Sequence, residues 1–221
     1  LFAALQIGYA QKVGLVLSGG GAKGAAHIGV IKALEENGIP IDYITGTSAG
    51  AIVGSLYAMG YTPEEMVELM LSEEFSYWQT GTVENEYKYY FKRPDPTPEF
   101  GHFSIDMTDS LQVKASFLPQ SLINPIQMNQ AFMALFSQAT AKAGWNFDNL
   151  FVPFRCVASD IYSKKAIIFK NGDLGDAVRA SMTFPFFFQP IWKDSVPIFD
   201  GGIYDNFPVG PMKEAFHPDF I

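Results

Sequence analysis

The sequence predicts an α/β protein with a parallel sheet, and three observations lead to this prediction. Short, nearly continuous apolar runs alternate with segments whose apolar residues recur at helical spacing. Few residues separate these segments, which is typical of strand–helix–strand units. The chain has 221 residues, enough for one large domain that buries roughly 70–75% of its unfolded surface.

Two strands and three helices are expected in the first third of the chain. Residues 12–19 (KVGLVLSG) form a β-branched apolar run typical of a buried parallel strand, and residues 39–46 (IPIDYITG) form a second. Between them, residues 24–38 have apolar side chains at helical spacing and end at a glycine. A helix rich in small residues is expected at 47–60. Another is expected at 62–75, which opens with a threonine, a proline and two acidic residues.

Beyond residue 75 the pattern is less regular. Residues 75–103 are aromatic, polar and broken by prolines, and we interpret them as an excursion from the sheet that contains a hairpin. Residues 124–144 predict an amphipathic helix. The side chains that this helix should direct into the core are Met128, Phe132, Met133, Leu135 and Phe136.

The last third of the chain returns to strands and helices. Residues 152–161 and 164–172 predict two strands joined by a turn. Residues 173–191 contain a helix that must end before Pro185. Residues 196–216 predict a strand, a glycine turn and the start of another helix.

Composition excludes several classes of partner. The net charge of −8, from 15 basic and 23 acidic residues, argues against nucleic acid and against electrostatic attraction to anionic lipid. The single cysteine, Cys156, excludes an intramolecular disulfide and a Cys-based zinc site. His27, His102 and His217 lie far apart with no His-x-x-x-His spacing, so we expect no metal and no cofactor.

Both ends of the chain suggest a segment of a longer protein. Residues 1–10 (LFAALQIGYA) are similar to the back half of a secretory signal with a cleavage point after Ala10. The alternative for these residues is a first strand or a short helix. The chain ends abruptly at residues 217–221 (HPDFI), as if a strand had been cut. No stretch reaches the length of a transmembrane helix.

Residues 16–29 (VLSGGGAKGAAHIG) place a glycine-rich loop between the first strand and the first helix. Such a loop brings backbone N–H groups close to a negative charge. Its G-x-G-x-x-G spacing allows a dinucleotide-binding interpretation, which requires an acidic residue at the end of the second strand. The candidate, Asp42, stands near the start of that strand instead. A P-loop is excluded because Gly24, and not Ser or Thr, follows Lys23.

A second loop, residues 46–50 (GTSAG), has the pattern G-x-S-x-G between a strand and a helix. Such a turn presents the Oγ of Ser48 above the sheet edge, and a side chain at either glycine would collide with the neighbouring strand or helix. The helix that follows directs its first N–H groups and the positive end of its dipole toward this Oγ. The alternative is a tight turn whose serine merely caps the helix.

The two loops should lie close together, because both follow neighbouring parallel strands and therefore meet at the carboxyl edge of the sheet. If Ser48 attacks a carbonyl, the N–H groups of Gly20, Gly21 and their neighbours would face the oxyanion that forms. One preorganised donor of this kind lowers the barrier by roughly 3–4 kcal/mol. The negative charge that the glycine loop stabilises would then be this oxyanion, which exists only during the reaction.

Ser48 needs a base, and Asp200 in IFDGG is the best candidate because it ends an apolar strand and precedes two glycines. A free aspartate is a weak base with a pKa near ~3.9, but partial burial beside the serine would raise that pKa. The alternatives are a turn aspartate, Asp205 beyond the turn, or a triad that uses His217 in a surface loop. His27 is expected to pack or hydrogen-bond within the first helix.

With these residues in place, the sequence resembles a known family, the patatin-like phospholipases. The resemblance lies in three ordered blocks and extends to HIGVIKALEE after the first and RASMTFPFFF before the third, so that it covers residues 12–209. Lys23 stands where the family often has Arg, which keeps the charge but loses the planar fork. The blocks are Gly19-Gly20-Gly21-Ala22-Lys23-Gly24, Gly46-Thr47-Ser48-Ala49-Gly50 and Asp200-Gly201-Gly202.

The resemblance implies a three-layer α/β/α fold with a mainly parallel central sheet. It implies acyl hydrolysis of lipids without a metal, by a dyad in which Ser48 is the nucleophile and Asp200 the base. Residues 19–24 would then form the oxyanion hole, residues 46–50 the nucleophile elbow, and Gly201 and Gly202 the turn after the base. Residues 11–221 would form the catalytic domain, shortened at its C-terminal end.

Three functions fit these residues. The leading one is a serine lipid acyl hydrolase of the phospholipase A or lysophospholipase type, which contacts the membrane transiently. The second is a short-chain esterase or thioesterase with the same mechanism. The third is a nucleotide- or phosphate-binding module that uses the glycine loop. Because residues 1–10 are similar to a secretory signal, we expect an exported protein in the periplasm or at the outer membrane. The abrupt C-terminus resembles bacterial members that continue into an outer-membrane barrel.

Overall fold

The structure is a computed structural model that describes residues 11–82, 102–106, 112–116 and 121–221, with the backbone alone for the two short ranges. Its central sheet, within the described part of the chain, has six strands in the order β1-β2-β5-β8-β7, with β6 also paired to β5. The strands are β1 (Gly14–Leu17), β2 (Tyr43–Thr47), β5 (Phe154–Asp160), β6 (Lys165–Phe169), β7 (Ile191–Lys193) and β8 (Val196–Asp200).

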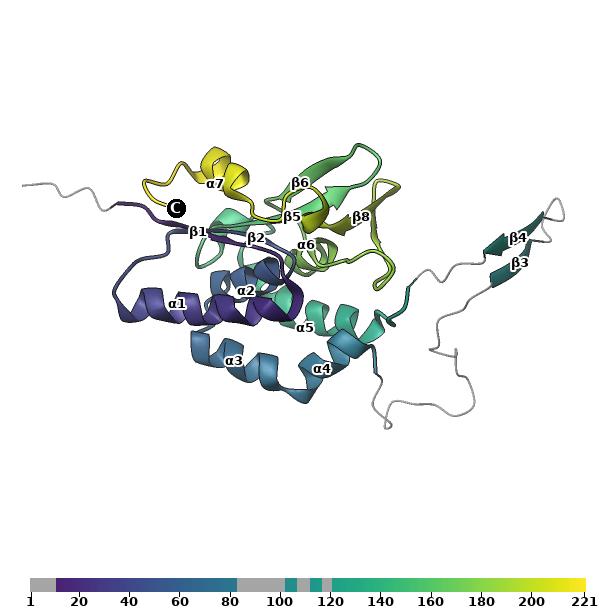
Figure 1. Cartoon of the computed structure of the whole chain (residues 1–221), viewed down its shortest axis with the longest axis horizontal. Helices are drawn as coiled ribbons and strands as arrows, with labels where there is room; N and C mark the ends of the chain where they lie inside the picture. The colour runs from purple at the N-terminus through teal and green to yellow at the C-terminus, as the bar shows by residue number, and fades with distance from the viewer. Residues whose placement is uncertain (1–10, 83–101, 107–111, 117–120) are drawn as a thin grey trace, which may run out of the picture.

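Helices lie on both sides of this sheet (Figure 1). The helix α7 packs on β1 and β2 from one face, while α2 and α6 pack on β5 from the other. The helices are α1 (Ala26–Glu36), α2 (Ala49–Ala58), α3 (Pro63–Leu71), α4 (Glu73–Thr80), α5 (Ile126–Lys142), α6 (Leu174–Ser181) and α7 (Val209–Phe216), and short 3₁₀ turns are η1 (Gly21–Ala25), η3 (Phe147–Asn149) and η4 (Gly201–Ile203). The three-layer α/β/α prediction is confirmed.

The sheet itself is mixed. β1, β2 and β5 are parallel neighbours, but β6 and β8 run antiparallel to β5, and β7 runs antiparallel to β8. The antiparallel partners arise because β5 and β6 are joined by a turn too short for a crossover, and β7 and β8 likewise. Parallel pairing is therefore confined to the half of the sheet that carries the two glycine loops.

The strands β2 and β8 share one edge of β5. Thr47, the last residue of β2, is paired with Val157, while Asp200, the last residue of β8, is paired with the next residue, Ala158. β6 occupies the other edge over the same residues. Because β2 and β8 run in opposite directions, their C-terminal ends meet head to head beside β5.

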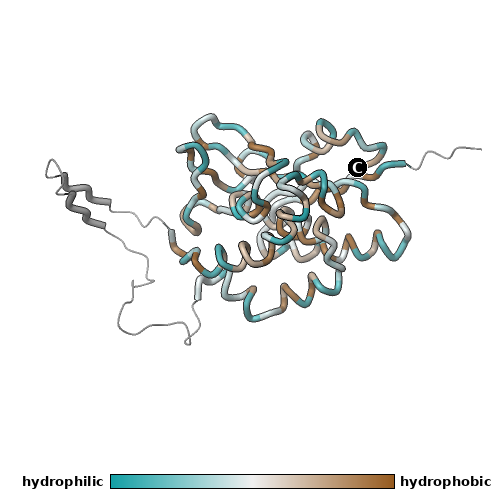
Figure 2. The backbone as a smooth tube through the Cα atoms, turned by 180° about the vertical axis from the view of Figure 1, so that it is seen from behind, coloured by the Kyte–Doolittle hydropathy of each residue, from teal (hydrophilic) through white to brown (hydrophobic). Residues whose placement is uncertain are grey.

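The core lies between the sheet and the helices. Figure 2 shows hydrophobic and hydrophilic residues alternating along the outer helices, as expected for amphipathic segments. In α5 the predicted core residues Met128, Phe132 and Phe136 are buried and Leu135 packs against them. The prediction was wrong for Met133, which is 66% exposed, because it lies about 100° around the helix from Phe132.

The helix expected at residues 62–75 is two helices. The predicted cap at Thr62 is confirmed as a full capping box with Glu65. The chain then breaks at Ser72, whose hydroxyl accepts from the N–H of Phe75 and caps α4. α4 therefore replaces the first residues of the expected excursion.

Two further predictions concern segments at or beyond the described residues. An antiparallel pair, β3 (His102–Asp106) with β4 (Gln112–Ser116), lies later than the hairpin expected within residues 75–103. The apolar residues 1–10 lie outside the described residues. Across the described ranges, no helix combines the length and the hydropathy needed to cross a membrane.

Candidate active site

Ser48 lies in a strained turn between β2 and α2. Its φ of 54° and ψ of −121° place a non-glycine residue in a region that persists only where the surroundings enforce it. The glycines of the turn are required by space. A Cβ on Gly46 would lie 2.5 Å from the carbonyl oxygen of Gly50, and a Cβ on Gly50 would collide with the backbone of Leu17. This geometry matches the sharp turn that presents a serine nucleophile.

The hydroxyl of Ser48 donates a 2.6 Å hydrogen bond to Oδ2 of Asp200. The other carboxylate oxygen, Oδ1, accepts from the N–H of Gly202 at 2.7 Å. This contact is possible because the ends of β2 and β8 meet beside β5. A Cβ on Gly201 would collide with the carbonyl of Val157, so the turn after Asp200 requires a glycine there.

The carboxyl group of Asp200 is a stronger base than an ordinary aspartate. Its residue is only 7% exposed, and burial raises its pKa above the usual value of 3.8 because the charged form loses hydration. The hydrogen bonds from Ser48 and Gly202 oppose this effect in part. A raised pKa brings the carboxylate closer to the basicity that proton abstraction requires.

Two residues that the sequence analysis did not single out hold this pair in place. The backbone N–H of Ser48 donates to Oγ of Ser181 at 2.8 Å, and the same Oγ donates to the carbonyl of Val157. The N–H of Asp200 donates to the carbonyl of Thr183 at 2.8 Å. One short segment at the end of α6 thus fixes the backbones of both Ser48 and Asp200.

The sequence pattern of this segment was noticed, but it did not predict what Ser181 contacts. Ser181 belongs to the stretch RASMTFPFFF, which formed part of the family resemblance. A buried serine between a helix and a proline gives no indication of its partner, because its contact with Ser48 spans 133 positions of the chain.

The glycine loop lies against the serine. A Cβ on Gly19 would lie 3.0 Å from Cβ of Ser48, and one on Gly24 would collide with Cβ of Ala49. The N–H of Gly19 already donates to the carbonyl of Asn206 at 3.1 Å, so it is not available to a ligand. Lys23 is exposed and does not line the cavity described below.

The loop after the base is attached to β2. The hydroxyl of Thr47 donates to the carbonyl of Asp205 at 2.9 Å, and that of Thr45 donates to the carbonyl of Pro208 at 3.0 Å. Asp205 therefore contributes its backbone carbonyl, which holds the loop on β2. The carboxylate that accepts from Ser48 belongs to Asp200. Asn206, which the sequence analysis did not single out, extends from this loop to the glycine loop and lines the cavity.

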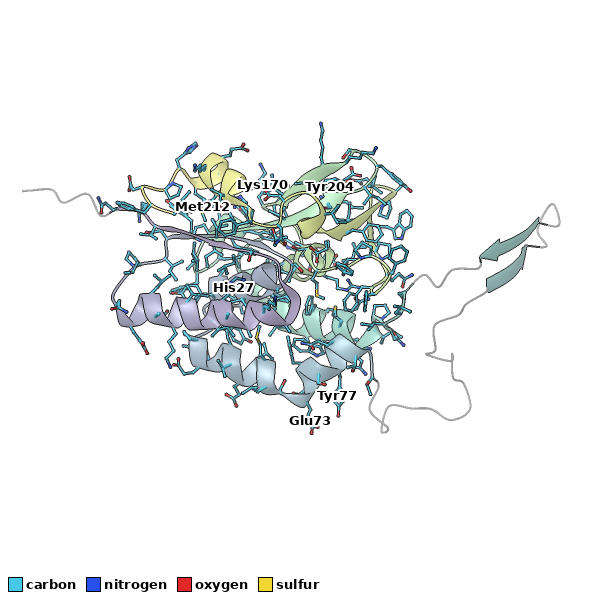
Figure 3. All side chains as sticks on the ribbon, viewed as in Figure 1. His27, Glu73, Tyr77, Lys170, Tyr204 and Met212 are labelled. Carbon is cyan, nitrogen blue, oxygen red and sulfur yellow. The ribbon has the colours of Figure 1, made fainter. Side chains whose placement is uncertain are left out.

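Within the described residues, no hydrogen bond joins a histidine side chain to Ser48 or Asp200. His27 lies in the first turn of α1, and its Nε2 is 2.9 Å from the carbonyl oxygen of Ser18, directly after β1, so the predicted hydrogen bond reaches outside the helix (Figure 3). His217 ends α7, and the residues just after it hydrogen-bond to Lys12 at the amino edge of the sheet, whereas Ser48 lies at the carboxyl edge. The side chain of His102 lies outside the described residues.

The acidic residue needed by a dinucleotide site is also at the amino edge. Asp42 precedes β2 and forms a 2.7 Å ion pair with Lys12, and its second oxygen accepts from the N–H of Val13. Asp42 therefore joins β2 to the start of the chain, far from the glycine loop. Among the described residues, no group of three or more His, Cys, Asp or Glu could hold a metal ion.

A cavity of about 1080 Å³ opens beside Ser48 and Asp200. Gly20, Gly21 and Ala22 form part of its wall, so the glycine loop faces the same space as the serine. The rest of the wall is mostly apolar and comes from α2 to α5, the segment after α6 and η4. Its large side chains are Ile52, Met70, Leu71, Phe75, Trp78, Met128, Phe132, Met182, Phe184, Phe187, Phe188 and Ile203.

Comparison with known proteins assigns this arrangement to a family. The family model described as patatin-like phospholipase matches residues 15–213. The chain belongs to the patatin-like phospholipase family. The match contains all three glycine blocks, from the loop after β1 to the turn after Asp200.

Relatives within the patatin-like phospholipases are much longer than this chain. A patatin-like phospholipase domain-containing protein of Caenorhabditis elegans is 29% identical over 91% of this chain and 12% of its own length. The lysophospholipase NTE1 of Pyricularia oryzae is 31% identical over 92% of this chain and 11% of its own length. The chain thus spans about one eighth of these relatives or less.

A solved structure gives the same fold for this patatin-like domain. The crystal structure of VipD from Legionella pneumophila superimposes with a TM-score of 0.55 and 18% identity, over 90% of this chain and 47% of that chain. The predicted family and the predicted fold class are both confirmed.

Proposed function

We propose that this chain is a serine lipid acyl hydrolase of the phospholipase A or lysophospholipase type. The observation that carries the proposal is the 2.6 Å hydrogen bond from Oγ of Ser48 to the carboxylate of Asp200 at the wall of a large apolar cavity. Membership of the patatin-like phospholipase family and the name of a lysophospholipase among its relatives support the same activity.

In the first half-reaction, Oγ of Ser48 attacks the ester carbonyl of the lipid while Asp200 accepts the hydroxyl proton. The carbonyl π bond opens to an oxyanion, which the N–H groups of Gly20 and Gly21 face. Collapse of this intermediate breaks the ester C–O bond, and Asp200 returns the proton to the departing alcohol. Ser48 is left acylated, as nucleophilic catalysis requires.

In the second half-reaction, water attacks the acyl-enzyme and Asp200 again accepts the proton. Collapse breaks the bond between Ser48 and the acyl group, and the proton returns to Oγ. The products are a free fatty acid and the unchanged enzyme. Each oxyanion donor lowers these barriers by roughly 3–4 kcal/mol, and a positioned base contributes about 10²–10⁴-fold.

The shape and chemistry of the cavity favour a lipid over a small ester. Its volume of about 1080 Å³ exceeds what an acetyl group needs, and each buried methylene contributes roughly 0.8 kcal/mol of binding free energy. A short-chain esterase or thioesterase with the same mechanism is the alternative. A nucleotide site is disfavoured because Asp42 is paired with Lys12 at the opposite edge of the sheet.

A fluorophosphonate probe followed by peptide mass mapping tests the proposal directly. Ser48 is expected to carry the label, and Ser48→Ala is expected to lose both labelling and ester hydrolysis. Labelling of another serine, or hydrolysis by folded Ser48→Ala, would overturn the assignment.

An exported protein in the periplasm or at the outer membrane stays a prediction. It rests on the apolar residues 1–10, which are similar to a secretory signal. The relatives named above, in contrast, are eukaryotic proteins. A following outer-membrane barrel is likewise a proposal drawn from the resemblance alone. N-terminal sequencing of the mature native protein tests export, since retention of residues 1–10 would contradict cleavage after Ala10.

A further inference from the structure

The opening of the cavity is lined by exposed apolar side chains. Leu71, Phe184, Phe187 and Ile203 belong to the cavity wall and are nevertheless 81%, 56%, 45% and 43% exposed. We call these four residues the rim. Deeper wall residues such as Phe132 are buried. Apolar surface therefore continues from the interior of the cavity out into solvent, and exposed patches of this kind mark binding sites.

Phe186, which with Pro185 separates the rim residues Phe184 and Phe187, is held in a costly conformation. Its φ is 69°, a region that bulky L-residues rarely adopt, and its side chain is 70% exposed. The carbonyl of Phe186 accepts from the N–H of Leu122 at 2.9 Å, and the carbonyl of Phe187 accepts from that of Ile123 at 2.9 Å. The backbone is thus fixed while the aromatic ring remains in solvent, and such maintained strain is typical of functional segments.

The same loop has an anchor on its inner side. Phe188 is half-buried, and its ring centroid lies 5.3 Å from the guanidinium carbon of the buried Arg179. Arg179 also donates to Oγ1 of Thr183 at 2.6 Å and to Oδ1 of Asn129 at 3.0 Å. A rigid base therefore carries the exposed rings, which limits the entropy that the loop would lose on inserting into another phase.

Charge decides which surface the rim fits. Asp200 is the only charged side chain on the cavity wall within the described part of the chain. The chain carries a net charge of −8, and Glu73 and Glu74 follow Leu71 almost directly; Glu73 lies on the outer side of α4 beside Tyr77 (Figure 3). An anionic surface would be repelled here, whereas a surface without net charge meets only the apolar rings.

We propose that the rim and Phe186 insert into the surface of a zwitterionic lipid bilayer. An acyl chain then passes from the bilayer into the cavity along continuous apolar surface, without crossing water. This inference rests on the proposed function, because a hydrolase of membrane lipids must receive its substrate from a bilayer. It adds the surface on which the protein works and the residues that bind that surface.

The test uses flotation of the inactive Ser48→Ala chain with phosphatidylcholine vesicles, so that hydrolysis does not change the lipid. Phe186→Asp in this background is expected to weaken vesicle binding at least tenfold. It should fold as well as its parent, because Asp tolerates the left-handed region better than Phe. Leu71→Asp, at an 81% exposed position, provides a second rim variant, and melting temperatures check that each variant folds.

The matched control is Phe151→Asp. Phe151 is 76% exposed but precedes β5 and therefore lies at the amino edge of the sheet, away from the cavity. This variant should bind vesicles like its parent. Equal loss in Phe151→Asp and Phe186→Asp, absent binding of the parent, or stronger binding to vesicles that contain phosphatidylglycerol would each overturn the proposal.

The two proposals fail separately. Labelling of Ser48 by the probe without vesicle binding would leave the hydrolase standing and remove the docking surface. Vesicle binding that depends on Phe186, with no labelling or hydrolysis at Ser48, would remove the hydrolase and leave the surface.

Discussion

The backbone N–H of Ser48 donates a 2.8 Å hydrogen bond to the hydroxyl of Ser181, at the end of a helix that lies 133 positions later in the chain. The same hydroxyl donates to Val157 on β5, and two residues later the carbonyl of Thr183 accepts from the N–H of Asp200. The distance between nucleophile and base is thus set by the end of α6 as well as by the sheet.

Ser181→Ala is expected to lower kcat by about 10–100-fold with little change in KM, because small displacements of a nucleophile are costly. It should also destabilise the fold by about 1–3 kcal/mol, since the partly buried N–H of Ser48 loses its acceptor. Ester hydrolysis and thermal unfolding measure the two effects.

Ser55→Ala is the matched control for this substitution. Ser55 is equally buried, but its hydroxyl donates to the carbonyl of Ile52 within α2 and does not contact the dyad. It should keep most of the activity. Equal kcat in the two variants would show that Ser181 has no positioning role.

Asp200→Asn should separate activity from stability. The proton acceptor is lost, so turnover should fall by about 10²–10⁴-fold. At neutral pH the free energy of unfolding should rise by about 0.5–2 kcal/mol, the range common for single stabilising substitutions. Burial raises the pKa of Asp200, so its charge destabilises the folded state.

The pH dependence of this stabilisation has a defined sign. The pKa of Asp200 is higher in the folded chain than the usual 3.8, so the folded state binds this proton more tightly. The free-energy penalty for burying the charged carboxylate of Asp200 is absent below pH 3.8 and grows as the pH rises through the raised pKa. The difference in melting temperature between Asp200→Asn and its parent should therefore shrink as the pH is lowered toward 3.8, and a constant difference would contradict the assignment.

The histidines discriminate a dyad from a triad. His27→Gln, His102→Gln and His217→Gln should each retain most of the activity, and kcat/KM should rise with pH as Asp200 ionises, with an acid limb above pH 3.8. Folded His217→Gln as inactive as Ser48→Ala would assign the base to histidine and leave Asp200 an orienting role.

Much of the active site could be predicted because its constraints are local. Gly46 and Gly50 are required by the turn around Ser48 itself, and the apolar run before Asp200 predicts the end of a strand. What remained hidden depends on long-range pairing. β8 runs antiparallel because of the way it pairs with one edge of β5. Nothing within its own sequence, VPIFD, encodes that direction. The contact of Ser181 with Ser48 depends on how α6 packs.

The glycine loop is expected to bind no nucleotide with useful affinity. Asp42 is held by Lys12 at 2.7 Å, and the N–H of Gly19 is already used by Asn206, so both requirements of a dinucleotide site are missing. Calorimetry with NAD, NADP, ATP and GTP should show no heat of binding. Micromolar affinity for any of them would restore the binding-module interpretation.

Acyl chains longer than about ten carbons should be hydrolysed faster than acetate, because each buried methylene contributes roughly 0.8 kcal/mol of binding. A series of nitrophenyl esters measures this preference. Narrowing the cavity should reduce it selectively. Met70 lines the cavity, and Met70→Trp should displace about two methylenes, which corresponds to about tenfold in the ratio of long-chain to acetate kcat/KM.

Met133→Trp makes the same replacement at a position that is 66% exposed on α5 and does not line the cavity. This variant should keep the parental chain-length preference, which separates cavity filling from a general effect of tryptophan. A maximum at acetate in the parent would favour the short-chain esterase. An unchanged ratio in Met70→Trp would place the acyl chain elsewhere, because a chain that occupies this cavity must meet the larger side chain.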